Sequence, residues 1–219
     1  MTNPAPMISL DFERKTEPDM IQAADEFLAI QKRRRSVRHY SSEKVPLNVI
    51  RKCIETAAQA PSGANKQPWS FVMVTDHETK RKIRLGAEKE EREFYESRAS
   101  ERWLNDLKKF DTNENKECLE QAPVLIAVFA QRHGSDKKEQ HYYVNESVGI
   151  ASGLLLAALH NAGLATLTHT PSPMKFLQEI LNRPQNERAY LLIPVGYPAK
   201  DCVVPAIHRK NIEEYLTEI

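Results

Sequence analysis

Glycine is scarce in this chain: only seven of 219 residues are glycine, and no stretch matches G-x-G-x-x-G or a glycine-rich triphosphate loop. The usual dinucleotide and nucleoside triphosphate fingerprints are therefore excluded. Cysteine is scarce too, because Cys53, Cys118 and Cys202 are widely spaced and odd in number. They form neither a zinc pattern nor a disulfide framework and predict a reducing, cytoplasmic location. We find no metal-ligand spacing and expect no metal.

The sequence also lacks an excess of charge of one sign and an apolar run long enough to cross a membrane. Basic and acidic residues number 31 and 30, so no global electrostatic attraction to nucleic acid is expected. The most apolar stretch, Val148–Leu159, is shorter than the ~20 residues that cross a bilayer. Residues 1–7 lack the basic and apolar regions of a signal peptide. We expect a soluble protein without nucleic-acid or membrane partners.

The remaining pattern predicts an α/β protein with one domain. Residues 1–18 are interpreted as a flexible N-terminal arm and residues 19–219 as a single domain without repeats or linkers. Helical spacing and short β-rich runs alternate along the chain. Helices are expected at 20–32, 46–58, 148–159 and 174–181, and strands at 69–75, 124–130, 165–168 and 190–195.

The stretch from Asn145 to Pro171 is the centre of the pattern. Its helix is apolar or small on nearly every face, which is typical of a helix covered all round. Gly163 is placed to end the helix in a left-handed conformation. The next strand leads into Thr168, His169 and Thr170, and ligands often bind where strands end. A plain core helix followed by a loop is an equally good interpretation.

Two further segments are candidate ligand sites. Residues 33–38, RRRSVR, are the densest basic cluster, which is either a solvated turn, a nuclear signal or a site for a phosphate. Residues 60–65, APSGAN, form a small-residue loop that lets the backbone approach a ligand, or they form only a turn.

The charged stretch 78–110 places Glu91 and Tyr95 one helical turn apart. It is interpreted as a mobile lid or an idle surface helix.

Taken together, these motifs resemble the flavin-dependent nitroreductase superfamily. The resemblance rests on RRSVR at 34–38, APSGAN at 60–65 with PW at 68–69, and VGYP at 195–198. Three more stretches resemble the iodotyrosine deiodinase family within it: RWLNDLKK at 102–109, HYY at 141–143, and 153–164. The resemblance covers residues 20–215. It implies an α+β nitroreductase-like fold with a mixed sheet, and a helix-mediated homodimer that exchanges C-terminal tails. Animal deiodinases carry an N-terminal membrane anchor, and we expect none in this sequence. The chain therefore resembles a soluble, bacterial-type member.

The resemblance also implies an FMN site, with the flavin held between subunits. Arg34, Arg35, Ser36, Val37 and Arg38 would hold the phosphate and ring, with Arg209 reaching the phosphate from the tail. Ser62 and Gly63 would line the flavin. Thr168, His169 and Thr170 would lie along the isoalloxazine, with the catalytic Thr170 hydroxyl near N5.

The same resemblance implies a halotyrosine substrate. Ala64 would touch it, and Glu91, Tyr95 and Lys116 would form a lid at about 88–117 that binds its amino-acid part. Their chemistry fits, since a carboxylate suits an ammonium, a lysine suits a carboxylate, and a buried zwitterion needs both. The expected reaction is reductive dehalogenation, with electrons from NAD(P)H directly or through a reductase. The alternatives are a broad nitro- or quinone reductase and a non-catalytic flavin- or amino-acid-binding protein.

Overall fold

The computed structural model describes residues 5–219, which divide into a unit ending at Arg34 and a unit of residues 35–219. The first unit is an extended segment followed by helix α1 (Glu17–Arg33). Thr16 caps that helix by accepting a hydrogen bond from the backbone of Asp19. The predicted helix at 20–32 is thus confirmed and begins three residues earlier. Part of the predicted arm, residues 1–4, lies outside the described residues.

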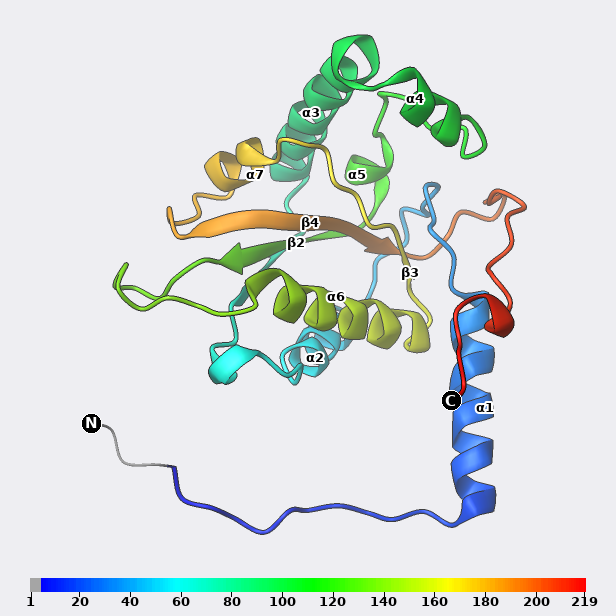
Figure 1. The fold of residues 1–219 in the computed structure, drawn as a ribbon. Coiled ribbons are helices and arrows are strands. Elements are labelled where there is room, and N and C mark those ends of the chain that lie inside the picture. The colour runs from blue at the N-terminus through cyan, green and yellow to red at the C-terminus, as the bar shows by residue number, and fades with distance from the viewer. Residues whose placement is uncertain (1–4) are drawn as a thin grey trace. The chain divides into compact units, whose positions relative to one another are not determined.

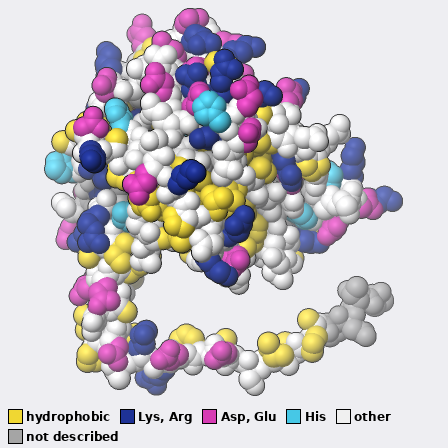
Figure 2. Space-filling view, turned by 180° about the vertical axis from the view of Figure 1, so that it is seen from behind, with side chains coloured by type: hydrophobic (Ala, Val, Ile, Leu, Met, Phe, Trp, Pro, Cys, Tyr) yellow, Lys and Arg dark blue, Asp and Glu magenta, His cyan; other side chains and the backbone are white. Residues whose placement is uncertain are grey.

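No residue of α1 is buried, so the first unit has no hydrophobic core of its own. Figure 2 shows hydrophobic side chains exposed along the extended segment and the helix. The large ones are Met7, Ile8, Leu10, Phe12, Met20, Ile21, Phe27 and Leu28. A segment with this much uncovered apolar surface needs another surface to cover it.

The second unit is built on a four-stranded sheet with the order β1-β2-β4-β3. Its strands are β1 (Trp69–Val74), β2 (Val124–Gln131), β3 (Ala165–Thr166) and β4 (Glu187–Gly196). All three strand pairings are antiparallel. The parallel part of the expected mixed sheet is one isolated bridge, between Ser36 and Thr166. The predicted strand at 165–168 is shortened, because Leu167 and Thr168 leave the ladder before His169 bridges Leu192.

Strand β2 is covered on both faces, as its continuous apolar run predicts. Side chains alternate along a strand, and those of β2 enter two separate cores. Val124, Ile126, Val128 and Ala130 belong to one core, and Leu125, Ala127 and Phe129 belong to the other. The sheet therefore has no solvent-exposed face at its centre.

Helices cover the two faces of this sheet (Figure 1). One face carries α2 (Leu47–Ala57) and α6 (Val144–Asn161), which pack on each other in the first core. The other carries α3 (His77–Glu93), α5 (Cys118–Gln121) and α7 (Lys175–Ile180). Beyond α3 the chain makes a π-helical turn, η2 (Phe94–Arg98), and then helix α4 (Glu101–Lys108). Single turns of 3-10 helix, η1 (Gly63–Asn65) and η3 (Ile212–Glu214), complete the unit.

Helix α6 departs from the prediction in one respect. It ends as expected, with Gly163 at a φ of 83°. It is not covered all round within residues 5–219, because Ile150 is 47% exposed and Leu154 38% exposed. The sequence alone could not show this, since an all-apolar helix does not say which face its own sheet covers. No helix among residues 5–219 is long and apolar enough to span a bilayer.

Candidate functional site

The basic segment after Arg34 is fixed at the edge of the sheet beside β3. Val37 donates its backbone N–H to Thr166 at 3.0 Å, and Ser41 donates to Tyr197 at 2.9 Å. The buried Tyr40 hydroxyl donates to the carbonyl of Pro194 at 3.1 Å. These bonds join the segment to both β3 and the end of β4, so Arg38 has a well-defined position.

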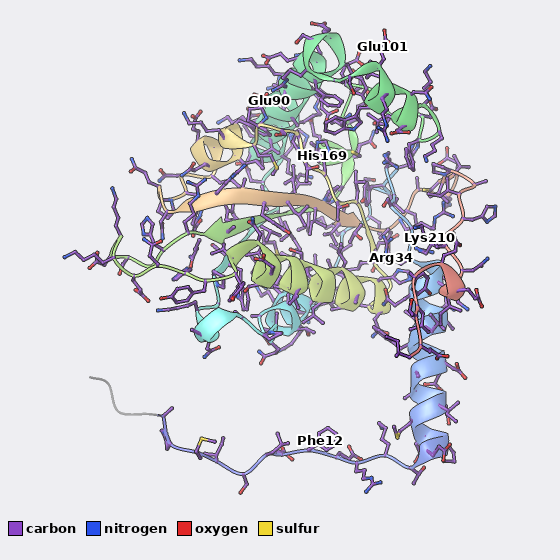
Figure 3. All side chains as sticks on the ribbon, in the orientation of Figure 1. Phe12, Arg34, Glu90, Glu101, His169 and Lys210 are labelled. Atoms are coloured by element: carbon purple, nitrogen blue, oxygen red, sulfur yellow. The ribbon has the colours of Figure 1, made fainter. Side chains whose placement is uncertain are left out.

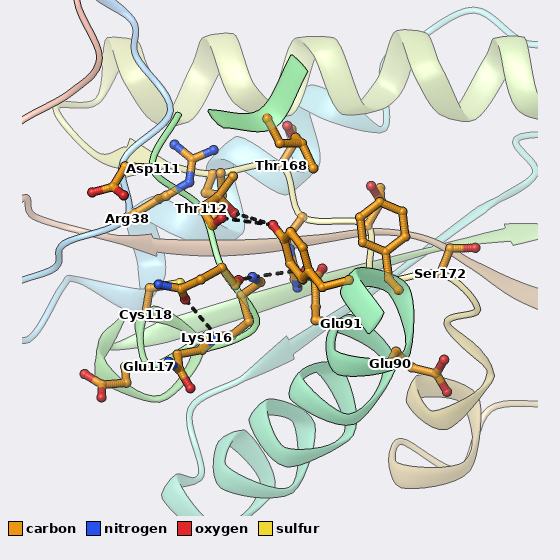
Figure 4. Close-up of a pocket in the computed structure, with 18 of the residues that line it drawn as sticks. Arg38, Glu90, Glu91, Asp111, Thr112, Lys116, Glu117, Cys118, Thr168 and Ser172 are labelled. Atoms are coloured by element: carbon orange, nitrogen blue, oxygen red, sulfur yellow. Dashed lines mark hydrogen bonds and ion pairs between the residues drawn. The ribbon is translucent and has the colours of Figure 1, made fainter. Parts of the chain in front are cut away.

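A pocket of about 760 Å³ lies between this segment and the residues from the end of α3 to the start of α5. Figure 4 shows the side chains that surround it. Several residues named as candidates from the sequence line it: Arg38, Glu91, Tyr95, Lys116, Thr168, His169 and Thr170. The structure thus brings together residues that are up to 132 positions apart, as 170 minus 38 gives.

The three predicted lid residues meet in this pocket. Glu91, on the last turn of α3, forms an ion pair with Lys116, with 3.1 Å between Oε2 and Nζ. The side chains are 15% and 9% exposed, so the pair is largely removed from water. Tyr95 follows on η2, and the Lys116 ammonium lies 5.9 Å from the centre of its ring. The Tyr95 hydroxyl donates to the Thr112 carbonyl at 3.1 Å, which ties η2 to the segment after α4.

The residue that fixes Lys116 was not among those predicted from the sequence. Glu88 is buried, and its Oε1 accepts the backbone N–H of Lys116 at 2.9 Å. Arg84 lies 3.7 Å from Glu88 and 2.8 Å from Glu120, so it joins α3 to α5. Lys80 donates to the Glu120 carbonyl at 2.9 Å. The available signal was helical spacing, since Glu88 precedes Glu91 by one turn.

His169 is the other buried polar side chain of the pocket, 8% exposed. Its Nε2 has no hydrogen-bond partner within residues 5–219 and lies 4.0 Å from Oε1 of Glu91. Burial, together with the positive charges of Lys116 and Arg38, lowers the pKa of His169 to about 3. The imidazole is therefore neutral near pH 7 and does not form an ion pair with Glu91.

Cys118 also lines the pocket, but it is not a reactive thiolate. Burial raises the pKa of its thiol to about 11. A cysteine nucleophile needs the opposite shift. We therefore expect no covalent chemistry at Cys118.

The remaining candidate residues lie elsewhere. Within the described part of the chain, Ser62, Gly63 and Ala64 do not line this pocket. They belong to a tight loop in which Ala64, Asn65 and Gln67 all have positive φ angles. Ala64, at a φ of 49°, is strained for a residue with a Cβ atom.

Close packing explains why the loop has a glycine at residue 63. A Cβ atom on Gly63 would lie 2.9 Å from the Tyr142 carbonyl. The loop therefore packs against the segment that leads into α6. Its strained backbone is held in place by the rest of the fold.

The other candidate arginines, Arg34, Arg35 and Arg209, do not line the pocket. Arg34 is the C-cap residue of α1 in the first unit. In the second unit, Arg35 donates a hydrogen bond to the Pro205 carbonyl, which ties the C-terminal tail to the basic segment. Arg209 follows four residues later on that tail, and its residue is exposed. Ser36 and Val37 lie in the backbone bridge to β3.

Three comparisons with known proteins agree with this architecture. Residues 32–197 match the nitroreductase family. The chain is 53% identical over 201 residues to an iodotyrosine deiodinase of Haliscomenobacter hydrossis, covering 89% of this chain and 90% of that protein. It is 46% identical over 209 residues to human iodotyrosine deiodinase 1, covering 93% of this chain and 72% of the human protein.

A solved structure adds ligands to the comparison. The crystal structure of oxidized iodotyrosine deiodinase bound to FMN and 3-iodo-L-tyrosine superimposes with a TM-score of 0.75 at 33% identity. The match covers 88% of this chain and 100% of the deiodinase chain.

Proposed function

The chain belongs to the nitroreductase family, and on that premise we propose that it is an FMN-dependent oxidoreductase that removes halide reductively from halotyrosines. The relatives at 53% and 46% identity are named iodotyrosine deiodinases, and the similar solved structure holds FMN and 3-iodo-L-tyrosine. The observation that carries the proposal is the meeting of Glu91, Tyr95 and Lys116 in one pocket.

These three side chains complement the amino-acid part of a halotyrosine. Glu91 binds the α-ammonium, Lys116 binds the α-carboxylate, and Tyr95 provides an apolar wall with a polar tip. In the structure Glu91 and Lys116 neutralise each other. A zwitterion replaces one internal ion pair by two intermolecular ones and leaves no buried charge without a partner. A neutral nitroarene would leave the internal pair intact and gain nothing from either residue.

The other pocket residues fit FMN. The pocket volume of about 760 Å³ is within the range of small-molecule sites. Besides the lid residues, the pocket is lined by Arg38 and by the threonines Thr112, Thr168 and Thr170. We propose that Arg34, Arg35, Ser36, Val37 and Arg38 hold the FMN phosphate and ring together with Arg209. Guanidinium forks suit phosphate oxygens.

The same proposal gives roles to the residues along the flavin and the lid. Thr168 and Thr170 would lie beside the flavin, and the Thr170 hydroxyl would donate a hydrogen bond at N5. FMN supplies two electrons, and with one proton the aryl–halogen bond becomes an aryl–hydrogen bond and a free halide. The chain itself orients the substrate and excludes water by closing a lid at about residues 88–117, within a domain that spans residues 19–219.

We also infer that the working form is a homodimer. Ser62 and Gly63 are candidates for lining the flavin and Ala64 for touching the substrate, yet all three lie outside the pocket of their own chain. A partner subunit supplies them if the flavin lies between subunits. The exposed apolar face of α6, with Ile150 and Leu154, is the surface that such a partner would cover. The C-terminal tails are then exchanged between subunits.

The electron donor and the location are further parts of the proposal. NAD(P)H, directly or through a reductase, is the donor class we propose, and cell fractionation would test the cytoplasmic location. The decisive experiment is anaerobic. Dithionite-reduced protein is mixed separately with 3-iodo-L-tyrosine and with a nitroarene, and tyrosine, iodide and reduced nitro product are measured. Tyrosine and iodide in equal amounts support the proposal. Nitro reduction without iodide release would instead identify a nitroreductase.

A further inference from the structure

His169 is held rigidly with its side chain turned into the pocket. Its backbone N–H donates to Leu192 at 2.9 Å, and its carbonyl accepts from Leu192 at 3.0 Å. These two bonds fix the direction of the side chain, because side chains alternate along an extended segment. Thr168 and Thr170 are accordingly exposed while His169 is buried. Figure 3 labels His169 on the segment that follows β3.

The polar edge of this imidazole faces the lid. Nε2 is 4.0 Å from Oε1 of Glu91, and the other carboxylate oxygen, Oε2, is 3.1 Å from Lys116. Glu91 thus lies between a cation and a neutral ring. A buried nitrogen without a partner costs free energy unless some state of the protein gives it one. The only anionic group within 4.0 Å of it, among residues 5–219, is Glu91.

We propose that His169 is a positioning residue of the substrate site, whose Nε2–H donates to Glu91 when the α-carboxylate of an amino-acid substrate draws Lys116 away. This inference rests on the proposed function. In the structure Lys116 occupies one side of the Glu91 carboxylate. Once Lys116 binds the substrate, Glu91 keeps only the substrate ammonium and needs a further donor to stay oriented.

Charge counting explains why a neutral donor suits this place. With substrate bound, Glu91 is balanced by the ammonium and Lys116 by the carboxylate. A second cation beside Glu91 would leave an uncompensated positive charge next to the substrate ammonium and close to Arg38. An imidazole that stays neutral in this pocket provides the hydrogen bond without the charge. His169 then acts on the amino-acid part of the substrate rather than on the flavin.

The test compares two substitutions and two ligands. His169→Leu removes the donor, and His169→Gln restores an N–H donor on a neutral side chain. Binding to the oxidised, FMN-loaded protein is followed by the quenching of flavin fluorescence. The ligands are 3-iodo-L-tyrosine and iodophenol, which lacks the ammonium and carboxylate. His169→Leu should weaken iodotyrosine binding by about tenfold or more, His169→Gln should restore most of it, and iodophenol should bind all three proteins alike.

A double-mutant cycle with Glu91→Gln shows whether His169 acts through Glu91. The loss caused by His169→Leu should shrink markedly in the Glu91→Gln background, because the charged acceptor is gone. Unchanged iodotyrosine binding in His169→Leu, equal losses for iodophenol, or no recovery in His169→Gln would each overturn the inference. If the leucine variant does not fold, His169→Met gives the same comparison. A parent protein that binds no iodotyrosine overturns the proposed function itself, whereas a binding parent with an indifferent His169→Leu overturns only this inference.

Discussion

Neutralising Glu91 and Lys116, singly and together, tests the exchange of ion pairs that we propose for substrate binding. The changes are Glu91→Gln, Lys116→Met and the double variant. The side chains are 15% and 9% exposed, so the pair does not belong with solvated surface pairs worth about 0–1 kcal/mol. Truncating one partner of a buried charge pair costs about 2–5 kcal/mol. The lower end corresponds to about 30-fold weaker binding of iodotyrosine, since about 1.4 kcal/mol is tenfold.

The internal ion pair makes the double variant informative. In the parent, substrate binding gains two pairs and loses the pair between Glu91 and Lys116. In either single variant that internal pair is already absent, so substrate binding no longer has to break it. This saving offsets part of the affinity that the substitution removes. The affinity loss of the double variant should therefore exceed the product of the two single losses, unless it first reaches the affinity of iodophenol. Without the internal pair, the two losses would simply multiply.

The assay is titration of the oxidised, FMN-loaded protein, read by flavin fluorescence, with iodotyrosine and iodophenol in parallel. Lys89→Met and Glu93→Gln are matched controls, since both residues are exposed on the same helix, α3. The controls should bind iodotyrosine like the parent. If Glu91→Gln and Lys116→Met also bind like the parent, the lid assignment is wrong. Equal losses for iodophenol would refute recognition of the zwitterion.

Four further outcomes are expected. Arg38→Ala should lower FMN retention, measured as bound flavin after dialysis, by removing a charge-assisted contact worth about 1.5–3 kcal/mol; full retention would exclude that contact. Thr170→Ala should lower iodide release relative to nitroarene reduction in parallel assays, and an unchanged ratio would contradict its role. Light scattering should give a dimer that Ile150→Glu and Leu154→Glu dissociate, whereas a monomeric parent with bound FMN would refute the dimer. Because burial, Lys116 and Arg38 lower the pKa of His169, its neutral form stabilises the fold fully above about pH 6.5 and progressively less as the pH falls toward 3. His169→Gln should flatten the loss of unfolding free energy across that window in urea titrations, and a parallel pH profile would contradict the neutral buried state.

Local patterns predicted much of the fold, because they depend on neighbouring residues alone. The apolar run of β2 and the stop at Gly163 are of this kind, and both are confirmed. The exposed face of α6 could not be predicted, since the pattern of an all-apolar helix does not distinguish its own sheet from a partner. Neither could the antiparallel pairing of every strand, which depends on contacts between residues far apart.

The candidate site shows the same division. Spacing on one helix predicted that Glu91 and Tyr95 share a face, and the family resemblance added Lys116; the structure brings all three together. The bond from Glu88 to the Lys116 backbone spans 28 positions, so helical spacing places Glu88 beside Glu91 but does not reveal this bond. The orientation of His169 is set by Leu192 on another strand. Such cross-chain contacts become visible only once the chain is folded.

The bonds between residues 36–41 and the end of β4 also constrain when this segment can fold during synthesis on the ribosome. Tyr40 and its acceptor Pro194 are 154 positions apart, so the basic segment leaves the ribosome long before its anchor. At about 5–20 residues per second, that interval is about 8–30 seconds. Throughout it, the segment that carries Arg38 lacks its anchor on β4, so the proposed phosphate site is not yet formed. We therefore expect FMN to bind only after β4 has been synthesised, and a chain stalled on the ribosome before that strand to be colourless.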